Sequence, residues 1–194
     1  MIAILRYNAG NAASVSYAVE RLGYPCTVTD DPNVIRMAEK VIFPGVGAAG
    51  TAMQYLKNRQ LDQVIRPLTQ PVLGICLGLQ LLCSFSEEDE TPCLGIFDVK
   101  VHRFPIGGLV PHTGWNNISV KPGQSPLLKN INSDHHFYFV HSYYAGITHA
   151  TSAVTDYILP FSAVMEKDNF FATQFHPEKS SSPGELILSN FLHL

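Results

Sequence analysis

The chain has 194 residues and a formal net charge of −3, with 46% hydrophobic and 15% charged residues. This composition predicts one globular domain with a full core and excludes a disordered chain. The weak negative charge offers no basic patch for nucleic acid, and no apolar run is long enough to cross a membrane.

The cysteines show neither metal-type pairing nor the spacing of a secreted disulfide framework: Cys26, Cys76, Cys83 and Cys93. Met1–Leu5 leads straight into an apolar stretch without a signal-peptide pattern. We therefore expect a single domain over residues 1–194, without a metal or other cofactor, in the reducing cytoplasm.

The first half alternates apolar strands with helical patterns. Strands are predicted at 2–5, 26–29, 40–43 and directly before Cys76. Helices are predicted over 14–22, 51–58 and 61–68 and from Cys76 to about Phe85, with turns at 8–11 and 30–33 and a short helix after the second turn. This order predicts an α/β fold with a largely parallel sheet and helices on both faces.

From Leu94 onwards the pattern changes to short strands, predicted at 99–101, 118–120, 137–143 and 151–157 and in a hairpin of 163–166 with 171–175. The stretch 111–116, which holds the single Trp, is predicted to be a loop. We expect these strands to be antiparallel additions that complete one mixed sheet. The last helix is expected to begin with Ser182 as its cap, Pro183 at the first helical position and Glu185 in a capping box.

Cys76 lies at the predicted junction of strand and helix, between Gly74 and Gly78. A Gly-x-Cys-x-Gly frame at this place is a nucleophile elbow with sulfur instead of oxygen. The start of the helix favours the thiolate, and the amide of Leu77 faces the position of an oxyanion. The alternative is a cysteine that merely fills the core, as most buried free cysteines do.

Two further segments contain candidate site residues. The glycines of Pro44–Gly50 let backbone amides approach a ligand, which suits the second half of an oxyanion hole, although many ordinary loops also carry glycine. Gln80 lies one helical turn after Cys76 and is either a substrate contact or a surface residue. The acidic run 86–90 is either a solvated loop or the source of a carboxylate for a substrate ammonium.

His176 and Glu178 stand two residues apart at the end of the last predicted strand, so their side chains can share one face. Such a pair supplies a general base and the carboxylate that orients it. The pair alone is weak support, but an elbow, a glycine-rich loop and His-Pro-Glu in this order are far less common together.

This constellation resembles the class I glutamine amidotransferases over nearly the whole chain. The family's Gly-x-Cys-x-Gly-x-Gln is matched by Gly74–Gln80, its Pro-Gly-x-Gly by Pro44–Gly47 and its His-Pro-Glu by His176–Glu178. The resemblance implies the family's flavodoxin-like fold and hydrolysis of the glutamine side-chain amide through a glutamyl thioester. It implies Cys76, His176 and Glu178 as the catalytic triad.

Within the family, Pro44–Gly47 with Ala52-Met53, Pro111–Asn116 and Tyr138–Tyr143 look like the glutaminase subunits of imidazole glycerol phosphate synthase. This resemblance implies a heterodimer with a cyclase subunit, which receives ammonia through an internal channel for histidine biosynthesis. The site residues that it implies are an oxyanion hole (Val46, Gly47, Leu77) and an L-glutamine pocket (Gly45, Gln80, Glu88, Ser142, Tyr143).

We expect the partner to dock on Trp115, Asn116 and Lys179. The alternatives are core packing for Trp115 and an isolated surface charge for Lys179. The glycine-flanked peptide at Val46 is expected to rotate at little cost, which would make activity depend on the partner.

Other functions remain open on the sequence. The chain can be the glutaminase of pyridoxal phosphate, anthranilate or guanylate synthesis, because the core motifs are shared. It can also be a non-catalytic relative or a cysteine peptidase-like hydrolase of the same fold. The intact Cys76, His176 and Glu178 disfavour the non-catalytic alternative. The combination of the Gln-containing elbow with the Pro44–Gly47 loop disfavours the peptidase alternative.

Overall fold

The computed structural model describes residues 1–8, 11–123 and 125–194, so the turn expected at 8–11 lies partly outside the described residues. The helices, including three short 3-10 turns, are α1 (Ala12–Arg21), α2 (Pro32–Met37), α3 (Ala49–Asn58), α4 (Leu61–Ile65), α5 (Leu77–Leu82), η1 (Glu88–Glu90), η2 (Pro126–Leu128), η3 (Pro177–Lys179) and α6 (Ser181–Leu192). The strands are β1 (Ile2–Leu5), β2 (Cys26–Thr29), β3 (Lys40–Gly45), β4 (Val72–Cys76), β5 (Phe85–Ser86), β6 (Thr91–Pro92), β7 (Lys100–Arg103), β8 (His112–Asn117), β9 (Ser119–Val120), β10 (His136–His141), β11 (Tyr143–Ala145), β12 (Thr151–Asp156), β13 (Pro160–Lys167) and β14 (Phe170–Thr173).

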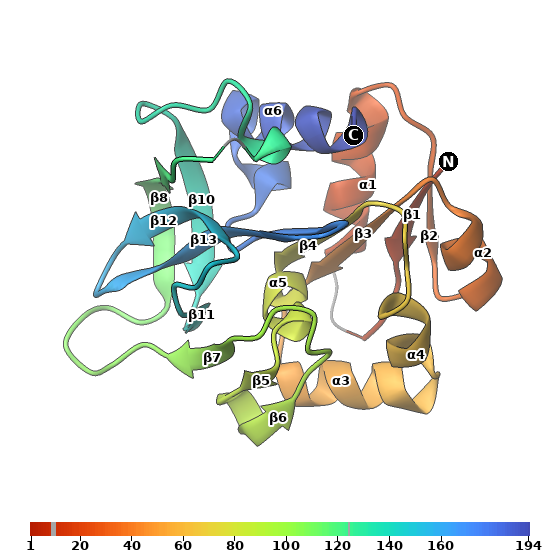
Figure 1. Ribbon diagram of the computed structural model, residues 1–194, viewed down its shortest axis with the longest axis horizontal. Coiled ribbons are helices and arrows are strands. Elements are labelled where there is room, and N and C mark those ends of the chain that lie inside the picture. Colours follow the sequence, from red (N-terminus) through yellow and green to blue (C-terminus); the bar gives the residue numbers. More distant parts are fainter. Residues whose placement is uncertain (9–10, 124) are drawn as a thin grey trace.

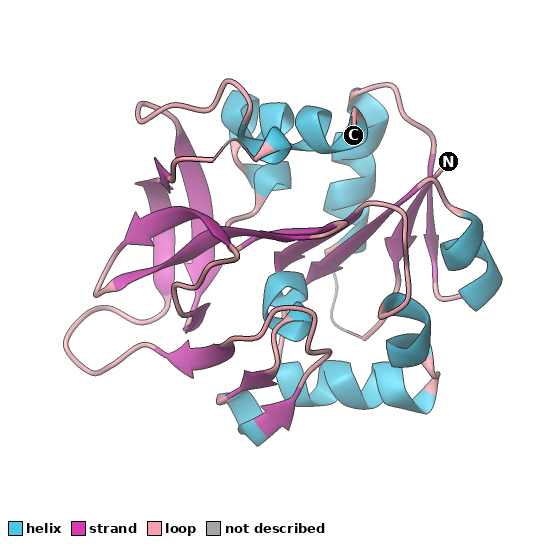
Figure 2. Cartoon of the chain, in the orientation of Figure 1, coloured by secondary structure: helices cyan, strands magenta, loops and turns pink. Residues whose placement is uncertain are grey.

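A mixed sheet in the order β2-β1-β3-β4-β14-β13-β12-β9 forms the centre of the molecule (Figures 1 and 2). The strands from β2 to β14 pair in parallel, and those from β14 to β9 pair antiparallel. The strands β1, β3 and β4 are short, buried apolar stretches joined by helices, as a sheet covered on both faces requires. The predicted α/β class with antiparallel additions in the C-terminal half is confirmed.

Helices cover both faces of this sheet. In Figure 1, α1 and α6 lie above it, whereas α3, α4 and α5 lie below it. Each face has its own apolar core, one containing residues of α2, α3, α4 and α5 and the other residues of α1 and α6. The carboxyl ends of β3 and β4 lie side by side, because Gly45 pairs with Cys76 in their register. Parallel sheets of this kind place their sites at such strand ends.

The strands of the second half do not all join one sheet, which differs from the prediction. β8 and β10 form a separate antiparallel ribbon, and β7 and β11 join β5 and β6 in a small sheet of their own. The predicted loop 111–116 was wrong, since most of it is β8, paired with β10 from His112 to Asn117. Cross-strand hydrogen bonds thus outweigh the loop preference of Gly114.

Several helices begin or end one to three residues away from their predicted limits. α1 and α3 begin two residues early, α4 ends at Ile65 and α5 at Leu82. The capping box at the last helix was wrong: α6 begins at Ser181, and Ser180 precedes it. The Ser180 hydroxyl donates to the carbonyl oxygen of His176 at 2.6 Å and accepts from the Tyr138 amide at 2.9 Å, so it anchors the site instead of capping the helix.

Within the part of the chain that the structure describes, no helix has both the length and the apolar character that a membrane span needs.

Candidate active site

Strand β4 ends in a sharp turn at Cys76, the residue that precedes α5. Its backbone has φ 53° and ψ −106°, a strained conformation that costs a non-glycine residue about 1–3 kcal/mol. A Cβ on Gly78 would overlap the carbonyl oxygen of Phe43 in β3, and a Cβ on Gly74 would lie 2.8 Å from a methyl carbon of Leu82. Both glycines are therefore required for the elbow to pack against its own sheet and helix.

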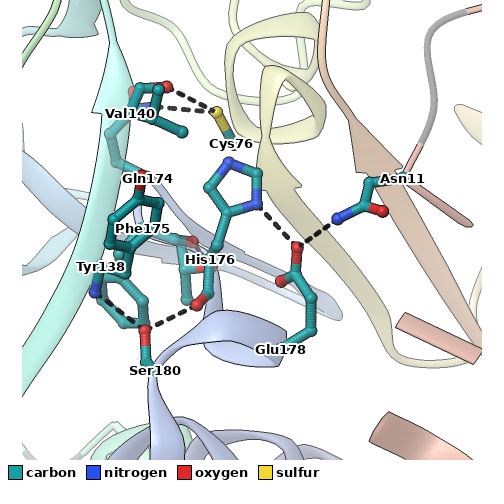
Figure 3. A network of polar contacts seen from close by, with 10 residues as sticks. Asn11, Cys76, Tyr138, Val140, Gln174, Phe175, His176, Glu178 and Ser180 are labelled. Atoms are coloured by element: carbon teal, nitrogen blue, oxygen red, sulfur yellow. Dashed lines mark hydrogen bonds and ion pairs between the residues drawn. The ribbon is translucent and has the colours of Figure 1, made fainter. Parts of the chain in front are cut away.

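His176 follows β14 and lies beside Cys76, as Figure 3 shows. Its Nδ1 is 2.7 Å from Oε1 of Glu178, and both side chains are only 1% exposed. Because a carboxylate accepts, Nδ1 carries the hydrogen and Nε2 is left for the thiol. This buried Nε2 has no hydrogen-bond partner among the described residues. Asn11 also donates to Oε1 of Glu178, at 3.3 Å.

The charge state of His176 follows from these neighbours. Burial by itself lowers the pKa of the His176 imidazole, but the negative charges of Cys76 and Glu178 outweigh it and raise the pKa to about 10. The two neighbours thus favour the protonated His176 ring, which a nucleophilic cysteine needs beside it.

A cavity of about 300 Å³ opens in front of the Cys76 sulfur. Most of the predicted substrate and oxyanion residues line it together with the nucleophile: Val46, Gly47, Cys76, Leu77, Gln80, Glu88, Ser142 and Tyr143. Pro111, Val140 and His141 line it as well. His176 and Glu178 adjoin the sulfur (Figure 3) but do not line the cavity. Gly45 does not line it either, and a Cβ there would overlap the Tyr7 hydroxyl.

The loop after β3 forms one rim of the cavity. The Tyr7 hydroxyl donates to the carbonyl oxygen of Pro44 at 2.6 Å and fixes the end of the strand, while Val46 and Gly47 beyond it are exposed. Gly47 has a φ of 115°, which only glycine adopts readily. Across the cavity, Leu77 is the first residue of α5, so its amide has no acceptor within the helix.

Among the acidic residues 87–90, Glu88 is the one that faces the cavity. Its Oε2 accepts from the Ala49 amide at the start of α3 at 2.7 Å, which also explains why α3 begins earlier than predicted. Burial raises the pKa of the Glu88 carboxyl; the Ala49 amide opposes the rise and the negative charge of Asp89 adds to it. Glu87 instead binds the His102 ring and the Arg103 amide, at 2.8 Å each.

Gln80 is a buried residue of the cavity wall, 4% exposed, and not a surface glutamine. Its Nε2 donates to the carbonyl oxygen of Tyr143 at 3.0 Å and to Oε1 of Gln174 at 3.2 Å. The elbow helix is thereby tied to β11, which begins at Tyr143.

His141 lies at the cavity floor and forms a buried pair with His112. Its Nδ1 is 2.7 Å from the Tyr143 carbonyl oxygen, and its Nε2 is 3.1 Å from Nδ1 of His112. Burial lowers the pKa of His141 to about 3 and that of His112 to about 4. Both rings are therefore neutral at pH 7, and the pair is a fixed polar element of the wall.

Two of the three predicted docking residues meet on one surface. Trp115 is 54% exposed on β8 and packs edge-on against Tyr138, at 6.0 Å between ring centroids. The Lys179 ammonium lies 6.0 Å from the centre of the same Tyr138 ring. The side chain of Asn116 lies on the opposite face of the strand from Trp115, and its amide donates to the Asp156 carbonyl oxygen at 3.0 Å. Core packing is thus excluded for Trp115.

The matches to known proteins cover the whole site. A family model described as glutamine amidotransferase class-I matches residues 5–194. The chain is 55% identical over 196 residues to the imidazole glycerol phosphate synthase subunit HisH of Bacteroides fragilis, covering 100% of this chain and 99% of that protein. The chain belongs to the class I glutamine amidotransferases.

Two further matches agree with membership of the class I glutamine amidotransferases. The protein of the same name from Bacteroides thetaiotaomicron is 53% identical over 196 residues, covering 100% of this chain and 99% of that protein. A solved glutamine amidotransferase matches 99% of this chain and 97% of its own with a TM-score of 0.75, and at 18% identity it shows the fold alone.

One buried side chain of this amidotransferase site was not predicted from the sequence. Gln174 is 0% exposed and reaches Cys76, with 3.7 Å between Nε2 and the sulfur. It stands two residues before His176, so an extended chain places both side chains on one face. That spacing is the signal that would have found it.

Proposed function

We infer that this chain is the glutaminase subunit of an imidazole glycerol phosphate synthase. The observation that carries the inference is the full-length identity of 55% to a protein of that name, in a chain whose Cys76 lines a cavity and has the His176–Glu178 pair beside it. The reaction is hydrolysis of L-glutamine to glutamate and ammonia.

In the first half of the proposed reaction, the Cys76 sulfur, whose proton is held by Nε2 of His176, attacks the carbonyl carbon of the substrate's side-chain amide. Glu178 holds the imidazolium by its Nδ1 hydrogen bond. The oxyanion of the tetrahedral intermediate accepts from the amides of Leu77 and of the Val46-Gly47 loop. His176 then protonates the amide nitrogen, the carbon–nitrogen bond breaks, and ammonia leaves a glutamyl thioester.

In the second half, His176 takes a proton from water as the hydroxide adds to the thioester carbon. The tetrahedral intermediate collapses, the carbon–sulfur bond breaks, and the proton stays on His176 beside the released sulfur. Glutamate leaves and the starting state of the site is restored. The chain needs no electron carrier for this cycle, since the reaction is a hydrolysis.

The proposed substrate pose uses the remaining residues of the wall. Glu88 binds the α-ammonium as a carboxylate, and backbone amides around Ser142 and Tyr143 bind the α-carboxylate. Gln80 contacts the substrate from the elbow helix. Gly45 contributes indirectly, because its missing side chain lets Tyr7 and Leu77 approach the strand end.

We propose that a cyclase subunit binds this chain as a heterodimer and receives the ammonia through an internal channel. The docking face consists of Trp115, Tyr138 and Lys179, an aromatic pair with a lysine that suits an acidic, partly apolar partner surface. The reactive thiol and the other free cysteines support a reducing cytoplasm as the setting.

We also propose that the partner controls the oxyanion hole. Gly47, at a φ of 115°, lets the peptide between Val46 and Gly47 turn at little cost, so partner binding can set its direction. The isolated chain is then a weak glutaminase that the cyclase stimulates when its own nucleotide is bound.

The decisive experiment replaces the nucleophile in the reconstituted complex. Cys76→Ala should reduce glutamine hydrolysis about 10³-fold or more, because the thioester cannot form, while cyclisation with added ammonium salt continues. Cys26→Ala, a thiol on β2 away from the cavity, is the matched control and should keep full activity.

Two outcomes would contradict the proposal. One is glutamine turnover that survives Cys76→Ala. The other is stimulation of the wild-type chain by the synthase of pyridoxal phosphate, anthranilate or guanylate formation and not by the cyclase.

A further inference from the structure

Gln174 is a buried amide whose contacts the proposed reaction does not use. Its backbone amide donates to the Ala163 carbonyl oxygen at 2.8 Å, which continues the pairing of β14 with β13 by one residue. Its side chain lies between two residues of the elbow. Oε1 accepts from Gln80 at 3.2 Å, and Nε2 lies 3.7 Å from the Cys76 sulfur (Figure 3).

The direction of both amides follows from the Tyr143 carbonyl oxygen. A carbonyl oxygen only accepts, so Gln80 must turn its NH₂ group towards it, at 3.0 Å. The second hydrogen of the same NH₂ group points to Gln174, which must therefore present its oxygen there. The NH₂ group of Gln174 is then left for the sulfur. The orientation of both side chains is thus determined by chemistry and not by an arbitrary choice of amide rotamer.

We propose that Gln174 is a positioning residue for the nucleophile: its amide, oriented through Gln80 by the Tyr143 carbonyl oxygen, donates a hydrogen bond to the Cys76 sulfur. A donor favours a thiolate more than a thiol, because a negatively charged acceptor makes the stronger bond. The amide therefore fixes the position of the sulfur and favours its negatively charged form beside His176. The proposal rests on the proposed function only in that Cys76 is the nucleophile.

Titratable groups from other elements also act on this sulfur. His176 lies beside it with Glu178 behind, Tyr7 adjoins it from the end of β1, and His141 and Glu88 line the same cavity. Gln174 differs from all of these because it carries no charge at any pH. Its removal should shift the pH profile of sulfur reactivity as a whole without adding a new titration step.

The test is alkylation of Cys76 by iodoacetamide in the isolated full chain, which needs neither glutamine nor a partner. Gln174→Met keeps the length and burial of the side chain but removes the donor. The pH at half-maximal alkylation rate should rise by about 1 unit. In the complex, kcat for glutamine should fall about tenfold while KM changes less than about twofold, because the variant affects the reacting atom and not the pocket.

The matched control is Thr173→Val on the neighbouring position of β14. Thr173 is as buried as Gln174, and its hydroxyl donates to the Phe175 carbonyl oxygen at 3.0 Å, so the variant also loses an internal hydrogen bond. It should lower stability without moving the alkylation profile. A Gln174→Met profile that coincides with wild type, or an equal shift in Thr173→Val, overturns the proposal.

Two further variants keep the test decisive. If Gln174→Met does not fold, Gln174→Asn retains an amide but is one methylene too short to bridge both contacts, and it should shift the profile in the same direction. Gln80→Met removes the hydrogen bond that orients the Gln174 amide but does not contact the sulfur itself. The double variant Gln80→Met with Gln174→Met should therefore shift the alkylation profile no further than Gln174→Met alone. A chain that shows these alkylation shifts but hydrolyses no glutamine with any partner would refute the proposed function and leave the role of Gln174 standing.

Discussion

Gly78 determines how closely the elbow helix approaches the sheet. Its Cα faces the carbonyl oxygen of Phe43, and the space of a Cβ is already filled by that backbone. Because a strand carbonyl in the middle of a parallel sheet is held by its neighbours, the clash cannot be relieved by rotating a side chain. The helix would have to move away from β3, which would also move the Leu77 amide.

We therefore predict that Gly78→Ala lowers the free energy of unfolding by roughly 2–4 kcal/mol, in the range of strong overpacking. The matched control is Gly146→Ala. A Cβ on Gly146 meets only a methyl group of Val99 at 3.7 Å, an ordinary contact, so its effect should stay within about 0.5 kcal/mol. Urea unfolding followed by circular dichroism measures both. Equal stability of the two variants would show that the elbow tolerates a side chain.

At the scale of elements, local signals were sufficient for some parts of the chain and insufficient for others. The strand, turn and helix around Cys76 are continuous in sequence, so the glycine frame alone predicted them. β8 was missed because its partners in β10 are 19 to 29 residues away (Asn117–His136 to His112–His141), while its own Gly114 indicates a loop. Gln174 was missed for the same reason, since its partners Gln80 and Cys76 are 94 and 98 residues away.

The predicted N-terminal cap of α6 was wrong for a different reason. Ser182, Pro183 and Glu185 satisfy every local rule for a helix start, yet the helix begins at Ser181. The hydroxyl of Ser180, which precedes the helix, is hydrogen-bonded to the backbone of His176 and Tyr138. These tertiary hydrogen bonds at the active site determine where the helix begins. Local capping rules do not contain that competition.

The ribbon of β8 and β10 carries the proposed docking face, which gives a prediction at the scale of elements. Trp115→Ala should weaken binding of the cyclase subunit by about 1–3 kcal/mol, roughly 5- to 150-fold in Kd, because an exposed Trp beside Tyr138 is typical of an interface hot spot. Isothermal titration calorimetry with the cyclase measures this. Tyr17→Ala on α1, an aromatic residue that is 65% exposed, is the control and should leave Kd unchanged. Equal affinity of Trp115→Ala and wild type would exclude this face.

At the scale of the whole molecule, buried histidines link stability to pH in opposite directions. His112 and His141 have folded pKa values of about 4 and about 3, below the ordinary 6.5, so the unfolded chain binds their protons more tightly. Their contribution is complete above pH 6.5 and is lost as the pH falls towards 4. His176 has a raised pKa of about 10, so its contribution is complete below pH 6.5 and is lost as the pH rises towards 10. Stability should therefore be highest near neutral pH.

The acid side of this profile can be assigned to the histidine pair. The pKa of the Asp30 carboxyl is lowered by the hydrogen bond from Arg6, and that of Glu87 by the bond from the Arg103 amide, so stability from these carboxylates is lost only below about pH 4.5. Between pH 4.5 and 6.5, the free energy of unfolding should fall by up to about 1.4 kcal/mol per pH unit for each histidine.

His112→Phe should flatten this slope by about half. The ring keeps its stacking on Tyr157, at 3.9 Å between centroids in the wild type, but no longer takes a proton on unfolding. Urea unfolding at several pH values between 4.5 and 6.5 measures the slope, and His149→Gln at an exposed position should keep the wild-type value. A wild-type slope in His112→Phe would mean that other groups cause the acid instability. A flattened slope would show that burial of the His112–His141 pair, which keeps both rings neutral beside the active-site cavity, causes the acid instability.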